Sequence, residues 1–257
     1  MVRKNWIVAI TVVFFIMGAL TGNALALDEI RIGTIGPTTG WATIFGQGCL
    51  NGIKLALGEY NNEFNGVPIK VFSEDTKAVV EVMRTKLDSL KTRDKVHLII
   101  GPSLGHEGMA AVDWGARNPE VPMLIGYSAP EDITMRKATD SVIRPGWTGA
   151  QVIFNFGQYC AKNLGYKKII IVGQDYSYPW DQAAGFIRGF LENGGEKVER
   201  IWHPVEAVDF SSIMAKLMSM SKEYDAVLNN SGGAQVIGFF KQWKQFGLDK
   251  VYPQILG

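Results

Sequence analysis

The chain has 257 residues, 47% of them hydrophobic, with 26 lysines and arginines against 25 aspartates and glutamates and a formal net charge of +1. This length can bury a substantial core in one large or two modest domains. The balanced charge gives no indication of nucleic-acid binding, and we expect no nucleic-acid partner. The two cysteines, Cys49 and Cys160, lie far apart in different helical patterns, so we expect free thiols.

Residues 1–26 have the three-part layout of a secretory signal peptide. Arg3 and Lys4 precede an apolar run over residues 6–20, and residues 24–26 read Ala-Leu-Ala. The run is shorter than the ~20 residues of a membrane-spanning helix, although an uncleaved anchor is the alternative. We expect cleavage after Ala26 and a secreted protein with 24 basic and 25 acidic side chains.

From residue 29 onward, short β-branched runs alternate with amphipathic stretches. This alternation is typical of an α/β fold in which helices cross over between parallel strands. Most of the runs are nearly all apolar, as are strands covered on both faces. The expected strands are residues 30–35, 69–72, 96–100, 121–125, 168–172, 198–202, 225–228 and 252–256.

Between these strands, apolar residues recur at helical spacing and predict helices that face a core. In chain order the stripes are Ile53, Ala56, Leu57 and Tyr60; Val79, Met83, Leu87 and Leu90; Phe186, Phe190 and Leu191; Phe210, Met214, Leu217 and Met220; and Val236, Phe239, Phe240, Trp243 and Phe246. We interpret these aromatic and methionine stripes as core, and we expect no cofactor.

The alternation breaks at residues 144–149, where a proline and two glycines precede a new helix near Ala150. We therefore expect two doubly wound parallel-sheet lobes, residues 27–145 and 146–257, joined by a hinge at this break. The chain stops one residue after its last predicted strand. No helix follows to cover that strand, so we expect the C-terminal part of the fold to be missing.

Residues 101–105, Gly-Pro-Ser-Leu-Gly, match the pattern of a hydrolase nucleophile elbow. Ser103 would attack, with Asp175 or Asp181 and then His203 completing a triad. Against this hypothesis, Pro102 precedes the serine, no His-Gly-Gly motif supplies oxyanion donors, and His203 falls in an apolar strand pattern. A secreted serine hydrolase is the less favoured alternative.

The same turn can bind an anion without breaking a bond. Residues 36–40, 101–105 and 126–130 follow three strands and are rich in glycine, serine, threonine or proline. Because parallel strands end at one edge of a sheet, these turns should converge beside helix N-termini. Ser103 and Ser128 could hold a ligand carboxylate there through charge-assisted hydrogen bonds. His106 either donates to that carboxylate or simply occupies the first helical turn; the histidine spacing predicts no metal site.

Five segments carry a family resemblance over essentially the whole chain after residue 26. They are "IGTIGPTTGWATIFGQGCLNGIKLAL" (32–57), "DKVHLIIGPSLGHEGMAA" (94–111), "VPMLIGYSAPEDIT" (121–134), "KKIIIVGQDYSYPWDQAAGF" (167–186) and "YDAVLNNSGGAQVIGFFKQWKQFGL" (224–248). In order and spacing the chain resembles type I periplasmic solute-binding proteins of ABC transporters, in the branched-chain amino-acid-binding family. The resemblance implies two lobes that close on a small ligand, membrane permease subunits as partners, and no catalysis.

The resemblance also implies roles for single residues. Ser128 matches the hydroxyl that holds the ligand carboxylate, with Gly126 and Tyr127 beside it. Gly105 and His106 stand where a second hydroxyl is usual, so that Ser103 or His106 would take its place. Aromatic contacts to the ligand match Phe45, with Trp41 close to it, and Tyr178, with Tyr176 and Trp180 close to it.

The ammonium half of an amino-acid site departs from the family pattern. Gly232 and Gly233 stand where a tyrosine commonly faces the ligand amine, and the usual acidic partner would lie beyond Gly257. Hydrophobic or aromatic carboxylates therefore compete equally with branched-chain amino acids as the expected ligand, with amides less favoured. A sensory ectodomain of the same fold is a further alternative.

Overall fold

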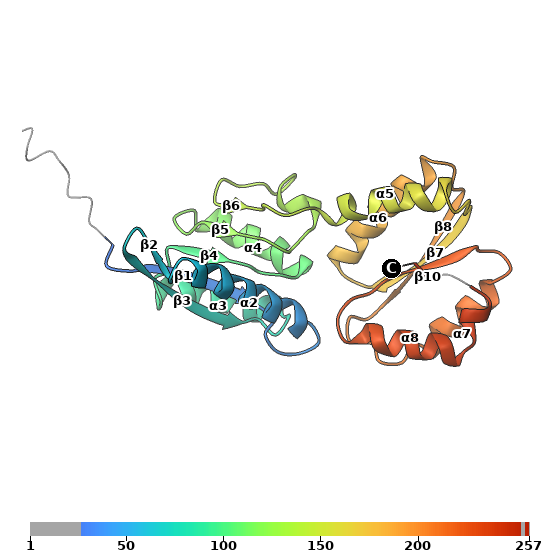
Figure 1. Cartoon of the computed structure of the whole chain (residues 1–257), viewed down its shortest axis with the longest axis horizontal. Helices are drawn as coiled ribbons and strands as arrows, with labels where there is room; N and C mark the ends of the chain where they lie inside the picture. The colour runs from blue at the N-terminus through green and yellow to red at the C-terminus, as the bar shows by residue number, and fades with distance from the viewer. Residues whose placement is uncertain (1–26, 253–254, 257) are drawn as a thin grey trace, which may run out of the picture.

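The computed structural model describes residues 27–252 and 255–256, and shows two α/β lobes side by side along the long axis of the molecule (Figure 1). The first lobe contains β1 (Ile30–Gly36), α2 (Thr43–Glu59), β2 (Glu63–Phe64), β3 (Val67–Asp75), α3 (Val80–Thr92), β4 (Leu98–Ile100), α4 (Gly105–Arg117), β5 (Met123–Leu124), η1 (Glu131–Ile133) and β6 (Val142–Ile143). The second lobe contains α5 (Gly149–Lys162), β7 (Lys168–Gln174), α6 (Ser177–Leu191), β8 (Lys197–His203), α7 (Ser211–Met220), β9 (Ala226–Asn230), α8 (Gln235–Gln245), η2 (Leu248–Lys250) and β10 (Ile255–Leu256). The expected signal peptide, residues 1–26, lies outside the described residues.

The first lobe is built on a six-stranded sheet of order β2-β3-β1-β4-β5-β6. Neighbouring strands run parallel except for β2 and β3, which are antiparallel. The turns that follow Gly36, Ile100 and Leu124 therefore lie at the same edge of the sheet. This topology places the three polar turns of the sequence together.

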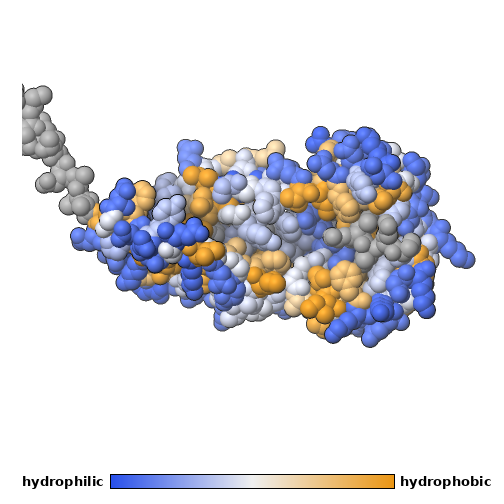
Figure 2. All heavy atoms as spheres, viewed as in Figure 1, coloured by the Kyte–Doolittle hydropathy of each residue, from blue (hydrophilic) through white to orange (hydrophobic). Residues whose placement is uncertain are grey.

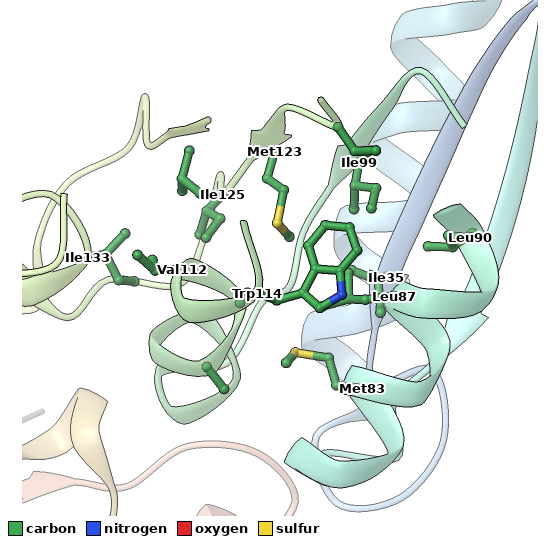
Figure 3. Close-up of a cluster of buried hydrophobic side chains, with 14 of the residues drawn as sticks. Ile35, Met83, Leu87, Leu90, Ile99, Val112, Trp114, Met123, Ile125 and Ile133 are labelled. Carbon is green, nitrogen blue, oxygen red and sulfur yellow. The ribbon is translucent and has the colours of Figure 1, made fainter. Parts of the chain in front are cut away.

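One face of this sheet is closed by a densely packed core. Ile35, Ile99 and Met123 point from three adjacent strands into a buried cluster with α3 and α4 (Figure 3). Trp114 of α4 lies among them, fully buried except for 3% of its surface, and its Nε1 donates to Asp88 Oδ1 at 2.7 Å. The core stripe predicted for α3 is confirmed for Met83, Leu87 and Leu90, which are all buried here, and is wrong for Val79, which precedes the helix and is 43% exposed.

The opposite face is only partly covered, and the core stripe predicted for α2 is wrong. Ala56 is exposed, and Tyr60, the residue that follows the helix, is 67% exposed. Gly46 brings the start of the helix close to the preceding turn, since a Cβ there would lie 2.0 Å from the Pro37 carbonyl oxygen. Further along, a cavity of about 390 Å³ separates α2 from the sheet. Its walls include Thr34, Ser73, Ile100 and Leu124 from the strands and Leu50 and Ile53 from the helix.

The second lobe has a four-stranded parallel sheet of order β10-β9-β7-β8 with two helices on each face (Figure 1). Helices α5 and α6 pack on one face and α7 and α8 on the other. Glycines bring α5 and α6 into close contact, since a Cβ on Gly189 would lie 2.0 Å from the Phe154 carbonyl oxygen. An apolar patch over α8 includes the exposed side chains of Ile237 and Phe240 (Figure 2).

The chain crosses between the lobes after β6. A capping box of Thr148 and Gln151 starts α5. Just before it, the Trp147 ring lies 6.3 Å from that of Tyr127, measured between centroids. The crossing segment therefore packs against the turn that follows β5.

The predicted α/β class and all eight predicted strands are confirmed. Strands β2 and β6 were missed, because two residues carry no readable periodicity. The last strand is shorter than predicted: Tyr252 lies in the core instead, where its hydroxyl donates to the Leu217 carbonyl at 3.0 Å. Cys49 and Cys160 are free thiols, as predicted, although Cys49 is only half-buried. Within the described residues, no helix is long and apolar enough to cross a membrane.

Candidate functional site

The candidate site is centred on the first turn of α4. Leu104 precedes this helix, and its apolar side chain cannot cap the N–H groups of the first turn. The buried Glu107 carboxyl interacts with the Leu104 backbone N–H, which leaves the N–H groups of Gly105 and His106 without a side-chain cap among the described residues. Such groups carry a partial positive charge and favour an anion. The turn therefore offers the donors that an acid group needs.

Two buried serines lie beside this turn. Ser103 is 4% exposed and Ser128 is 1% exposed, and neither Oγ has a nitrogen or oxygen partner among the described residues. The Cys49 thiol, a weak donor and acceptor, interacts with the Ser103 hydroxyl. Glycines make room for both: a Cβ on Gly36 would lie 2.9 Å from Ser103 Oγ, and one on Gly108 would lie 1.9 Å from Ser128 Oγ. Burying a hydroxyl without a partner costs about 1–3 kcal/mol, and a ligand that accepts from it would recover this cost. Neither serine would have to break a bond to another oxygen or nitrogen first.

His106 presents an acceptor rather than a donor. Its Nε2 lies 3.1 Å from the Ala78 carbonyl oxygen, which can only accept, so Nε2 carries the proton. The Nδ1 atom is buried and has no partner in the described structure. Burial lowers the pKa of His106, which keeps the ring neutral at neutral pH. The sequence left two roles for His106: donation to a ligand carboxylate, or a place in the first helical turn without a ligand contact. The first role requires a protonated ring.

Aromatic rings from both lobes surround the site. Phe45 lies 5.8 Å from Tyr127 within the first lobe, between ring centroids. Tyr176 of the second lobe reaches across to Trp41 at 6.1 Å and to His106 at 5.5 Å, both edge to face. The cavity beneath α2 extends to this region, where Ser103, Gly126 and Tyr127 form part of its wall.

Gly105 and Tyr178 meet at the contact between the lobes. A Cβ on Gly105 would lie 3.0 Å from the Tyr178 backbone nitrogen. The Tyr178 hydroxyl accepts a hydrogen bond from Gln182 Nε2 at 2.9 Å, and burial raises its pKa to about 12. The Trp180 indole points elsewhere and donates to Asp175 Oδ1 at 3.0 Å.

The proposed hydrolase triad is not assembled. His203 lies in the second lobe, with Nδ1 2.8 Å from the Pro204 carbonyl oxygen and Nε2 2.8 Å from Ser231 Oγ. Asp181 accepts from the Ala150 backbone N–H at 2.9 Å, and the other candidate acid is held by Trp180. The base and both acids are thus engaged away from Ser103. The part of the chain that the structure describes also contains no group of three or more side chains able to hold a metal.

Sequence reasoning missed two residues of this region. Ser177 begins α6, and its Oγ is buried with no partner in the described chain. Trp147 contacts Tyr127 from the crossing segment. Ser177 lies in the family segment over residues 167–186 and Trp147 in the break at residues 144–149, but neither position had a ligand role in the resemblance. Their environment depends on how the second lobe sits against the first, and the one sequence signal was the small residue at position 105.

Comparison with known proteins agrees with this architecture. The model of the family described as periplasmic binding protein matches residues 29–256. A Leu/Ile/Val-binding protein homolog from Brucella melitensis is 26% identical over 231 residues, covering 90% of this chain and 58% of the relative. A solute-binding protein of an ABC transporter from Rhodopseudomonas palustris, solved with 3,4-dihydroxybenzoic acid, matches with a TM-score of 0.79 and 29% identity over 88% of this chain and 60% of that one.

A leucine-binding protein from Thermotoga maritima matches with a TM-score of 0.75 and 25% identity, over 85% of this chain and 61% of that chain. The chain thus belongs to the periplasmic binding protein family, whose members bind solutes without catalysing a reaction. The resemblance to the branched-chain amino-acid-binding proteins is confirmed. The chain spans about three-fifths of the length of these relatives.

Proposed function

We propose that this protein is the substrate-binding component of an ABC importer and that its ligand is a small aromatic carboxylate. The observation that carries the proposal is the pair of buried hydroxyls, Ser103 and Ser128, which have no nitrogen or oxygen partner in the described chain and lie beside the start of α4. A carboxylate can accept from both hydroxyls and from the free backbone N–H groups. Charge-assisted bonds of this kind are about twice as strong as neutral ones.

The surroundings of the hydroxyls favour an aromatic ligand over an amino acid. Phe45, Tyr127 and Trp41 of the first lobe, together with Tyr176 of the second, offer ring faces and edges for stacking. Glu74 of the adjoining cavity wall is engaged by Lys86 and Arg93, so it offers no free charge to an ammonium group. Solute-binding proteins at 29% and 26% identity were solved with 3,4-dihydroxybenzoic acid and 4-hydroxybenzoate, which supports this choice.

His106 has a place in the same proposal. Its neutral ring leaves Nδ1 as an acceptor. A phenolic hydroxyl on the ligand could donate to it, whereas a carboxylate could not. Hydroxylated benzoates should accordingly bind more tightly than benzoate when the hydroxyl reaches Nδ1.

The remaining features follow from membership of the family. Residues 1–26 would direct export and be removed, which places the protein in the periplasm. Residues 27–145 and 146–257 would act as the two lobes, and permease subunits would recognise their closed form. The protein would act without catalysis and without a cofactor.

Calorimetric titration with benzoate, 4-hydroxybenzoate, leucine and benzamide tests the ligand class. Benzamide has nearly the shape of benzoate but no charge. We expect benzoate to bind, benzamide to bind at least tenfold more weakly, and leucine to bind more weakly than either benzoate or 4-hydroxybenzoate. Equal affinity for benzoate and benzamide would show that the site does not recognise a carboxylate. Preferential binding of leucine would show that the ligand is an amino acid rather than an aromatic acid.

A further inference from the structure

The two lobes touch at the starts of two long helices. A Cβ built on Gly105, the first residue of α4, would lie 2.7 Å from Ser177 Oγ, at the first residue of α6. A side chain at position 105 would force Ser177 Oγ to rotate away and would crowd the Tyr178 backbone nitrogen, 3.0 Å from the same Cβ position. The N-termini of a 13-residue helix and a 15-residue helix therefore face each other across the cleft.

Two helix N-termini in contact bring together two partial positive charges. Within the described residues, neither N-cap side chain accepts from its helix, and the first turn of α6 contains no acidic residue. The first turn of α4 contains Glu107, but burial raises its pKa to about 7, so this carboxyl carries only part of its negative charge at neutral pH. Like charges at this distance disfavour closure unless an anion lies beside both. The geometry therefore makes closure of the lobes sensitive to the charge of the ligand.

Unpaired hydroxyls mark the position of that anion. Ser177 Oγ is buried from the second lobe, and Ser103 and Ser128 are more than nine-tenths buried from the first lobe. None of the three hydroxyls has a nitrogen or oxygen partner in the described structure. Three unpaired hydroxyls around one helix start would lower the free energy of unfolding, unless a ligand that binds there accepts from them.

We infer that Ser177 supplies a third hydroxyl to the ligand carboxylate, from the second lobe, so that the acid group is fully bound only when the lobes are closed. This inference rests on the proposed function. It assigns Ser177 and the N-terminus of α6 to ligand binding and makes the negative charge of the ligand the link between binding and closure. A neutral analogue of the same shape would fill the site without drawing the lobes together.

Benzoate titration of Ser177→Ala, Ser128→Ala and Ser211→Ala tests the inference. Ser211 is the matched control, because it is also the first residue of a helix in the second lobe but lies in α7. We expect Ser177→Ala to lose affinity roughly tenfold, with the melting temperature unchanged, and Ser211→Ala to bind as wild type does. Unchanged affinity in Ser177→Ala with reduced affinity in Ser128→Ala would overturn the inference alone; unchanged affinity in both would overturn the proposed function as well.

Small-angle scattering with and without benzoate provides the second test. Gly105→Ala places a methyl group between the two helix starts, where it would lie 2.7 Å from Ser177 Oγ. We expect benzoate to compact the wild type but not Gly105→Ala, and benzamide to compact neither. Compaction of Gly105→Ala to the wild-type radius would contradict the inference even if Ser177→Ala failed to fold.

Discussion

The buried hydroxyls beside the strand ends of the first lobe differ from Gln174, a buried side chain at a strand end of the second lobe. In the first lobe, the hydroxyls of Ser103 and Ser128 are buried without nitrogen or oxygen partners in the described chain. In the second lobe, Gln174 at the end of β7 is fully buried, yet its Nε2 donates to the Val205 carbonyl at 2.9 Å and its Oε1 accepts from the Gly232 N–H at 3.0 Å.

This difference separates scaffold from binding surface. A side chain that satisfies its neighbours holds loops in place, and its loss leaves those neighbours unpaired. A buried hydroxyl that makes no hydrogen bond within the protein contributes no hydrogen-bond energy to stability until a ligand binds it. Ser177 is informative because it belongs to the second lobe by sequence and to the unpaired group by environment.

The largest effect on stability is expected for Gln174, the buried side chain whose hydrogen bonds are all made within the protein. Gln174→Leu keeps the volume of the side chain but leaves the Val205 carbonyl and the Gly232 N–H without partners. We expect a loss of about 2–4 kcal/mol in the free energy of unfolding, measured by urea denaturation. Gln245→Leu, at an exposed position of α8, is the control and should change stability by less than about 0.5 kcal/mol.

The second prediction concerns Ser128, an unpaired hydroxyl, whose removal should change ligand affinity but not protein stability. Ser128→Ala should weaken binding of benzoate by about 1.5–3 kcal/mol, because it removes a hydrogen bond to a charged oxygen. The free energy of unfolding of the ligand-free protein should be unchanged or slightly higher, because the hydroxyl has no partner in the described chain to lose. Ser219→Ala, at an exposed position, should change neither quantity. A large loss of stability in Ser128→Ala would place this serine among the scaffold residues.

Sequence patterns predicted the strands well because a strand buried on both faces needs a continuous apolar run, whatever its neighbours are. They failed for α2, where Ala56 and Tyr60 have the spacing of a core stripe but are exposed, Ala56 at the wall of a cavity. Periodicity shows that a face is apolar, not that something covers it. For the same reason Ser177 carried no signal: its environment depends on how the second lobe sits against Gly105.

Glu107 extends the comparison to a group that titrates. This glutamate lies in the first turn of α4 and is fully buried, and weak contacts to the Thr76 hydroxyl and the Leu104 backbone N–H oppose the effect of burial. Burial raises its pKa from 4.5 to about 7. The folded protein therefore holds a proton that the unfolded chain releases, so stability should fall as pH rises from about 4.5 to about 7 and then level off.

Glu107→Gln should abolish this dependence and raise the free energy of unfolding by about 1–3 kcal/mol at pH 8. Denaturation at a series of pH values measures both changes. Glu81→Gln, an exposed glutamate in the first turn of α3, should leave the pH profile as in the wild type. An identical profile in Glu107→Gln would show that this carboxyl is solvated in the folded protein.

The smallest effect is expected for a second-lobe hydroxyl that is already engaged. Tyr178→Phe keeps the ring and removes only the acceptor of Gln182 Nε2. Affinity for benzoate should change by less than about 0.5 kcal/mol in calorimetric titration. A loss comparable to that of Ser128→Ala would show that this hydroxyl turns from its own helix to the ligand.

The edge-to-face contact of Trp41 with Tyr176, at 6.1 Å between ring centroids, joins rings from opposite lobes. Because indole emission shifts to longer wavelength in water, the protein contains its own optical reporter of opening. The difference between wild-type and Trp41→Phe emission spectra isolates this signal from the other tryptophans. Rapid mixing with ligand would then time the approach of the two lobes without any attached dye.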